Sequence, residues 1–69
     1  MNKMYLIKVK DINDDRTIME ILDCGTIDET LDNLNIFIVT ADECSISKLK
    51  TCHGVTRIEV DENLMNVMI

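Results

Sequence analysis

The sequence contains no proline and only two glycines among its 69 residues. It therefore has no flexible linker that would mark a second module, and a chain of this length forms one domain at most. We predict a single domain over residues 1–69, in which residues 62–69 form a C-terminal tail. A domain of this size buries only about 60% of the surface that its unfolded chain exposes, so its stability is marginal.

Basic and aromatic residues are scarce. Lysine and arginine total 7 against 13 acidic residues, which gives a formal net charge of −6. Nucleic-acid binding needs a basic surface, because phosphate contacts supply most of the affinity. One tyrosine and one phenylalanine provide no platform on which bases could stack. We therefore expect no nucleic-acid partner.

Long apolar runs are absent as well. No run approaches the roughly 20 residues that cross a bilayer, and the run at residues 4–7 is stopped by Lys8. That run is too short for the core of a secretory signal, which needs about 7 to 15 apolar residues. The three cysteines are odd in number and irregularly spaced, unlike a disulfide framework. These features predict a cytoplasmic protein with no membrane association.

Four segments have the pattern of β-strands. Residues 4–10 alternate apolar and polar side chains, and residues 35–40 contain four successive apolar residues, typical of a central strand that is covered on both faces. Residues 26–31, with Ile27 and Leu31 on one side, and residues 55–60 complete the set.

The first of two predicted helices begins after Asp14 or Asp15, either of which can cap it, and ends at Gly25. Its inward face comprises Ile18, Ile21 and Leu22, which recur at three and four residues.

The second predicted helix begins at the segment Thr-Ala-Asp-Glu (residues 40–43), which matches a capping box with the Thr40 hydroxyl as the cap. It runs to about Cys52 with Ile46 and Leu49 facing inward, and Gly54 is expected to end it in the left-handed conformation.

The order strand, helix, strand, strand, helix, strand predicts an α+β, ferredoxin-like βαββαβ two-layer sandwich. Right-handed crossovers place both helices on one face of a four-stranded antiparallel sheet. The other face of the sheet is left uncovered.

Catalytic and metal-binding patterns are weak. His53 has no orienting partner or nucleophile that the sequence identifies, and a helix end is its simplest setting. Cys44 and Cys52 lie eight residues apart, about 12 Å along a helix, which is too far for shared zinc ligation. The paired acids Asp14–Asp15 and Asp28–Glu29 suit a helix cap and a solvated strand edge. We therefore predict neither enzymatic activity nor a metal or cofactor.

The tail has two interpretations, both open. Five of its last six residues are apolar: Leu64, Met65, Val67, Met68 and Ile69. They can complete the core as an edge strand or flap. Alternatively, the tail is an extended segment that inserts into a groove of a partner, where backbone hydrogen bonds provide affinity and alternate side chains fill pockets.

Much of the chain resembles the subtilisin propeptide family and its free-standing relatives, the cytosolic proteinase B inhibitors of fungi. Four segments carry the resemblance: residues 25–27 (GTI), 34–42 (LNIFIVTAD), 46–49 (ISKL) and 54–61 (GVTRIEVD). Residues 4–10 fit the opening strand of that family.

The resemblance implies a mechanism. In that family the uncovered sheet face packs on surface helices of a subtilisin-like serine protease, and the tail lies in the substrate cleft as a product. By this analogy Leu64 reaches the fourth pocket before the cleavage point and Val67 the first, while Met68 and Ile69 extend past the end of the family's tail. The acidic residues would suit positive helix N-termini on a protease. The implied binding residues are Glu59, Asp61, Glu62, Leu64, Met65, Asn66, Val67, Met68 and Ile69.

A second hypothesis needs no protease. The chain would be a regulatory interaction module, of the kind found in phages and mobile elements, whose open sheet face forms a homodimer or binds another host protein. Outward-facing residues of the sheet, such as Leu6 or Phe37, would then matter more than the tail.

Overall fold

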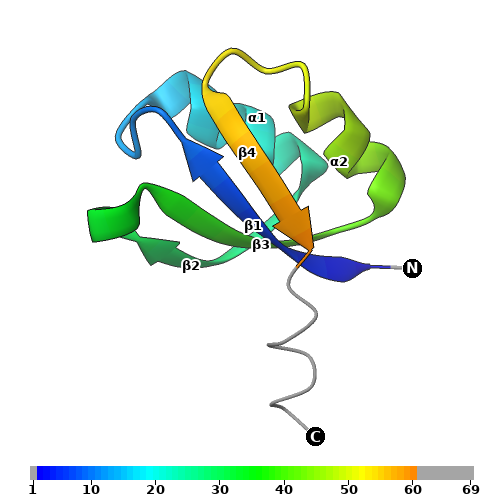
Figure 1. Ribbon diagram of the computed structural model, residues 1–69. Coiled ribbons are helices and arrows are strands. Elements are labelled where there is room, and N and C mark those ends of the chain that lie inside the picture. Colours follow the sequence, from blue (N-terminus) through cyan, green and yellow to red (C-terminus); the bar gives the residue numbers. More distant parts are fainter. Residues whose placement is uncertain (1, 61–69) are drawn as a thin grey trace, which may run out of the picture.

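The computed structural model describes residues 2–60, which form one antiparallel sheet and two α-helices (Figure 1). The strands follow the order β2-β3-β1-β4 across the sheet, and both helices lie on the same side of it. This is the predicted ferredoxin-like α+β arrangement. Along the chain the elements are β1 (Lys3–Val9), α1 (Asp15–Cys24), β2 (Gly25–Leu31), the 3-10 turn η1 (Asp32–Leu34), β3 (Ile36–Ala41), α2 (Glu43–Leu49) and β4 (Val55–Val60).

The core lies between the sheet and the helices. Residues directly opposite each other in an antiparallel pair point to the same face, and Tyr5 of β1 pairs with Val39 of β3 in this way. Ile21 of α1 and Leu49 of α2 close the core from the helix side and are almost fully buried. The buried apolar residues that form it are Tyr5, Ile7, Val9, Ile12, Ile21, Phe37, Val39, Ala41, Ile46 and Leu49.

Strand β3 occupies the centre of the sheet with β1, as its apolar run predicts. The prediction that it is covered on both faces is not met within residues 2–60, because both helices lie on one side of the sheet. Phe37 and Val39 face the helices, while Ile38 faces the other way and is still only 7% exposed. The expectation that Phe37 points outward is therefore wrong. It lies opposite Ile7, whose side chain is completely buried.

Of the two predicted cap residues, Asp14 is the N-cap of α1, and its Oδ1 accepts the backbone N–H of Arg16 at 3.3 Å. Its Oδ2 accepts the hydroxyl of Thr17 at 2.8 Å. The inward face is shifted from the predicted one, because Leu22 is 54% exposed. Each residue turns the helix by about 100°, so a stripe centred on buried Thr17 and Ile21 carries Leu22 away from the sheet.

Strand β2 is irregular, which changes the predicted facing of its residues. Ile27 pairs with Val39 on the helix side, but the register shifts between Ile27 and Glu29, and Leu31 then pairs with Ile36 on the opposite side. A β-bulge adds one residue to one strand and reverses the alternation beyond it. The prediction that Ile27 and Leu31 share a side is therefore wrong.

The N-terminus of α2 differs from the predicted capping box. Thr40 remains in β3 and its hydroxyl donates to Asp28. Asp42 is the cap instead, and its Oδ1 accepts the backbone N–H of Ser45 at 2.7 Å, which lowers the pKa of the Asp42 carboxyl. Glu43 does not make the return contact of a capping box; it forms an ion pair with Lys3 at 2.9 Å instead.

The C-terminus of α2 is also corrected by the structure. The helix ends at Leu49 rather than near Cys52, and the following residues form turns. Gly54 does not have a positive φ; Asn35, at the end of η1, is the residue in the left-handed region with φ 55°. Gly54 is instead required by close packing, because a Cβ there would lie 2.0 Å from the Thr17 hydroxyl oxygen.

Candidate protein-binding interface

The sheet has one face that neither helix covers, which we call the open face. Strand register places Leu6 beside Ile38, and Ile36 between Leu31 and Lys8. Met4 lies opposite Thr40 on the same face. The apolar residues of the open face are thus Met4, Leu6, Leu31, Ile36 and Ile38.

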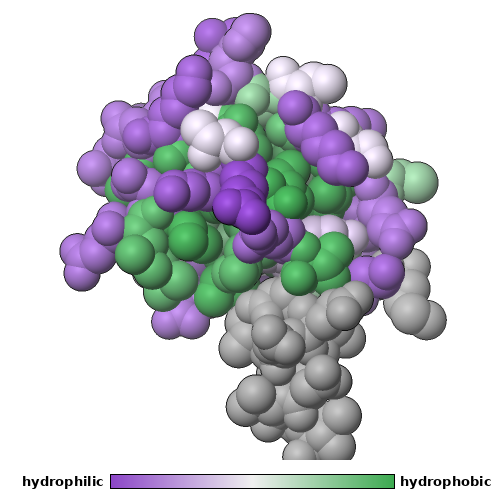
Figure 2. Space-filling view, in the orientation of Figure 1, coloured by the Kyte–Doolittle hydropathy of each residue, from purple (hydrophilic) through white to green (hydrophobic). Residues whose placement is uncertain are grey.

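These five side chains are neighbours on the sheet, and they differ in how much of each is exposed to solvent. Ile38 is buried among its neighbours, while Met4, Leu6, Leu31 and Ile36 are half-buried. Figure 2 shows apolar side chains gathered between hydrophilic ones on the side of the molecule in view. A contiguous apolar surface rimmed by polar groups is typical of a protein-binding site, so the open face can bind an apolar surface of complementary shape.

Charged residues border the open face on both sides. On the β4 side Arg57 lies opposite Lys8, and Glu59 lies opposite Leu6. Arg57 forms an ion pair with Glu59, its neighbour on the same face of the strand. On the β2 side Glu29 lies opposite Ile38. The rim therefore offers both signs of charge to a partner.

One of the nine predicted binding residues lies within the described part of the chain. Glu59 is exposed on β4 at the border of the open face, in a position where it can contact a partner. The other eight lie outside the described residues: Asp61, Glu62, Leu64, Met65, Asn66, Val67, Met68 and Ile69. The apolar residues of the open face were missed, except for Leu6. The alternation of residues 4–10 indicated Met4, and the second face of the apolar run 35–40 indicated Ile36 and Ile38, whereas the facing of Leu31 depends on the bulge in β2.

The outer edge of β4 is a second exposed feature. Within residues 2–60, β4 pairs with β1 alone. A shallow groove runs along it on the helix side, between β4 and α2. The groove consists of two depressions that share Lys50 and Ile58. One is lined by Tyr5, Glu43, Ile46, Ser47, Lys50, Ile58 and Val60, and the other by Lys50, Val55, Thr56, Arg57 and Ile58.

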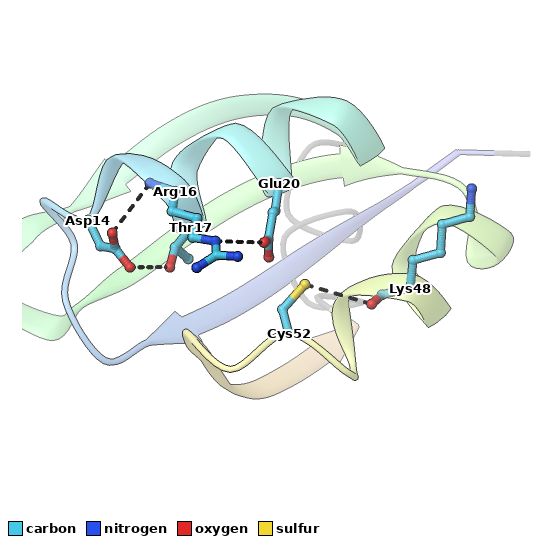
Figure 3. A network of polar contacts seen from close by, with 6 residues as sticks. All are labelled: Asp14, Arg16, Thr17, Glu20, Lys48 and Cys52. Carbon is cyan, nitrogen blue, oxygen red and sulfur yellow. Dashed lines mark hydrogen bonds and ion pairs between the residues drawn. The ribbon is translucent and has the colours of Figure 1, made fainter.

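Of the residues that could carry chemistry, Asp14, Cys52 and His53 border one depression between α1 and the segment after α2; Figure 3 shows Asp14 and Cys52 there. Cys44 lies on α2 and Asp28 and Glu29 lie on β2, away from this depression. Glu20 also lines the depression, and His53 is exposed. The Cys52 thiol donates to the Lys48 carbonyl at 3.8 Å, and burial together with Glu20 raises its pKa to about 11. Burial also raises the pKa of Cys24. Thiols with raised pKa values are protonated at neutral pH and are poor nucleophiles.

The difference between the cysteines can be measured by alkylation. At pH 8 we expect Cys44, which is exposed, to react with iodoacetamide several times faster than Cys52, because Cys52 is less accessible and its raised pKa keeps it in the unreactive thiol form. Mass spectrometry of the alkylated peptides over time gives both rates. Unfolding in urea should remove the difference. Equal rates in the folded protein would contradict the assignment of Cys52 as a half-buried, protonated thiol.

The described residues contain neither a metal-binding cluster nor a membrane-spanning helix. In the described range 2–60, no group of three or more histidine, cysteine or acidic side chains is placed to hold a metal ion. Neither helix of this part of the chain is long and apolar enough to span a membrane.

Comparison with known proteins gives no relative for the chain. No family model, curated protein or solved structure matches it. The resemblance to subtilisin propeptides consequently rests on sequence segments alone, which are residues 4–10, 25–27, 34–42, 46–49 and 54–61.

Proposed function

We propose that this chain acts by binding another protein through the open face, without catalysis, and that it does so in the cytoplasm. The observation that carries the proposal is the apolar surface formed by Met4, Leu6, Leu31, Ile36 and Ile38 on the side of the sheet opposite the helices. In a two-layer domain, the sheet face that points to solvent usually carries polar side chains. The apolar character of the open face is therefore best explained by a partner.

The partner that we propose is a subtilisin-like serine protease, which the chain inhibits. The open face would dock on the surface of the protease, and residues 64–69 would occupy the substrate cleft as a product. Glu59 supports this arrangement, because it lies at the border of the open face on the strand that leads to those residues. A carboxylate there can approach a helix N-terminus of the partner.

Titration of a subtilisin-type protease, with hydrolysis of a chromogenic peptide as readout, tests both parts of the proposal. The full chain should inhibit, and a chain that ends at Asn63 should not. Leu6→Asp should weaken inhibition by about tenfold or more, because it places a charge at the centre of the docking surface. Leu22→Asp is the matched control, since Leu22 is exposed on α1 in the helix layer, and it should inhibit like the original chain.

The outcomes separate the docking surface from the tail. Circular dichroism must first show that all variants are folded. Loss of inhibition in Leu6→Asp with retention in Leu22→Asp supports the open face as the docking surface. Absence of inhibition by the full chain against several such proteases would contradict the protease as partner.

The second candidate function is a regulatory interaction module that binds a different host protein. The open face favours it equally, because that surface needs no contribution from residues 61–69 to bind. A partner whose binding is lost in Leu6→Asp but retained by the chain ending at Asn63 would support this alternative.

A further inference from the structure

We propose that two copies of this chain pair through the outer edge of β4, joining their sheets into one continuous antiparallel sheet. The inference rests on β4 itself and does not depend on the proposed function. An exposed edge strand presents unpaired backbone N–H and C=O groups to any strand that can align with it. Natural sheets usually protect such edges with charges that repel a second copy, whereas the charges of β4 are arranged so that they attract one.

The facing of the β4 side chains restricts the possible alignments. Ile58 and Val60 lie opposite core residues Ile7 and Tyr5, so they face the helix side, while Arg57 and Glu59 face the open side. If both copies keep their helices on the same side of the joined sheet, each β4 residue must lie opposite a residue of the other copy whose side chain points to the same face. The symmetric pairing must therefore be centred on a residue, and not between two residues.

The pairing can be centred on Arg57, Ile58 or Glu59, and only the alignment centred on Ile58 places opposite charges next to each other. Centring on Arg57 places two arginines directly opposite each other, and centring on Glu59 does the same for two glutamates. Like charges in directly opposed positions destabilise a strand pair. Centring on Ile58 places Arg57 of each copy opposite Glu59 of the other, which occurs twice because the pairing is two-fold symmetric.

The same alignment also covers apolar surface. The two Ile58 side chains meet on the helix side, within the groove between β4 and α2. Val60, which is 43% exposed, comes near Thr56 of the second copy. Thr56 lies where the register of β4 with β1 shifts, so the regular pairing is limited to residues 57–59. The Arg57–Glu59 ion pair within each chain becomes part of a group of four alternating charges. Such an interface is small, so we expect weak association.

Native mass spectrometry and sedimentation velocity on the full chain, from about 1 µM to about 1 mM, cover the range in which a small interface associates. The original chain should dimerise in the upper part of this range. Arg57→Glu and Glu59→Arg each replace both attractive contacts by repulsive ones, so each should raise the dissociation constant of the dimer by about tenfold or more. The double variant, with the two charges exchanged, should dimerise again.

Mixing the two single variants is the decisive step. Neither variant can form the ion pair within its own chain, and mixing does not change that. Between chains, however, two acidic residues of one variant meet two arginines of the other, so the mixture should form a heterodimer of intermediate mass. Asp23→Arg, which replaces an acid by arginine at an exposed position of α1 in the helix layer, should associate like the original chain.

Three results would overturn the proposal. One is an original chain that remains monomeric over the whole concentration range. Another is a dimer whose dissociation constant is unchanged by Arg57→Glu, which would place the interface elsewhere. The third is a mixture of single variants that forms no heterodimer. Circular dichroism shows whether each variant is folded, and all of these substitutions are at exposed positions.

Discussion

Replacing Gly25 by alanine should lower the free energy of unfolding by about 3 kcal/mol or more, which is a large part of the stability of a domain this small. Gly25 lies opposite Ala41 at the start of β2. A Cβ at residue 25 would lie 2.3 Å from the carbonyl oxygen of Thr40 and 2.7 Å from the Cβ of Ala41. The first contact is with the backbone of a central strand, which no change of rotamer can relieve. Overpacking of this kind forces the strands apart.

Urea denaturation followed by circular dichroism measures this effect. Thr26→Ala is the matched control, because Thr26 is the next residue of the same strand and is exposed; its effect should stay within about 0.5 kcal/mol. Adding Ala41→Gly to Gly25→Ala should recover only part of the loss, because the Thr40 carbonyl remains in place. A Gly25→Ala chain as stable as the original would show that β2 and β3 can separate at little cost.

Gly54→Ala should cost about 2 kcal/mol, for a reason that involves the cap of α1. A Cβ at residue 54 would lie 2.0 Å from the hydroxyl oxygen of Thr17 and 3.1 Å from its Cβ. Thr17 is only 4% exposed and donates its hydroxyl to Asp14, the N-cap residue. Moving Thr17 aside therefore breaks a hydrogen bond as well as disturbing the packing.

A double-mutant cycle isolates this contact. Thr17→Ala removes the hydroxyl and methyl groups that clash, so the second substitution, Gly54→Ala, should add little to the loss in that background. Thr17→Ser keeps the hydroxyl and should give no such relief. Strictly additive losses for Gly54→Ala and Thr17→Ala would mean that residue 54 is constrained by something other than Thr17.

The fold was predictable because local patterns and topology agree. The alternation of residues 4–10 is determined by burial against Phe37 and Val39, and the apolar run of β3 reflects its central place in the sheet. Asp14 also caps α1 as expected, since that interaction spans only a few residues. Signals that arise from neighbours along the chain, or from simple burial, can be read from sequence.

Features that depend on contacts between distant segments were not predictable. The facing of Leu31 depends on the bulge in β2, and a shift of one residue reverses every side chain beyond it. Thr40 satisfies the capping-box pattern, yet the sheet retains it and Asp42 caps α2. Gly54 has the sequence pattern of a helix stop after α2, but a glycine is required there because the residue packs against Thr17 of α1.

The candidate site likewise has a part that could be predicted from the sequence and a part that could not. An uncovered sheet face followed from the order of the elements, but its members depended on the register of β2 and β3. The expectation that Leu6 faces outward is confirmed, whereas the same expectation for Phe37 is wrong. The self-complementary charges of β4 were visible in the sequence, but their meaning depends on β4 being an edge strand.

The central position of β1 has a consequence for how the chain folds during synthesis. β1 is made first, but one of its two partners in the sheet, β4, is made last among the described strands. Pairing over so long a separation must wait until residues 55–60 have left the ribosome. Until then Tyr5 and Ile7 have a strand neighbour on one side only, at β3. A chain truncated before Val55 therefore leaves the second edge of β1 unpaired, and we expect it to be more sensitive to proteolysis than the full chain.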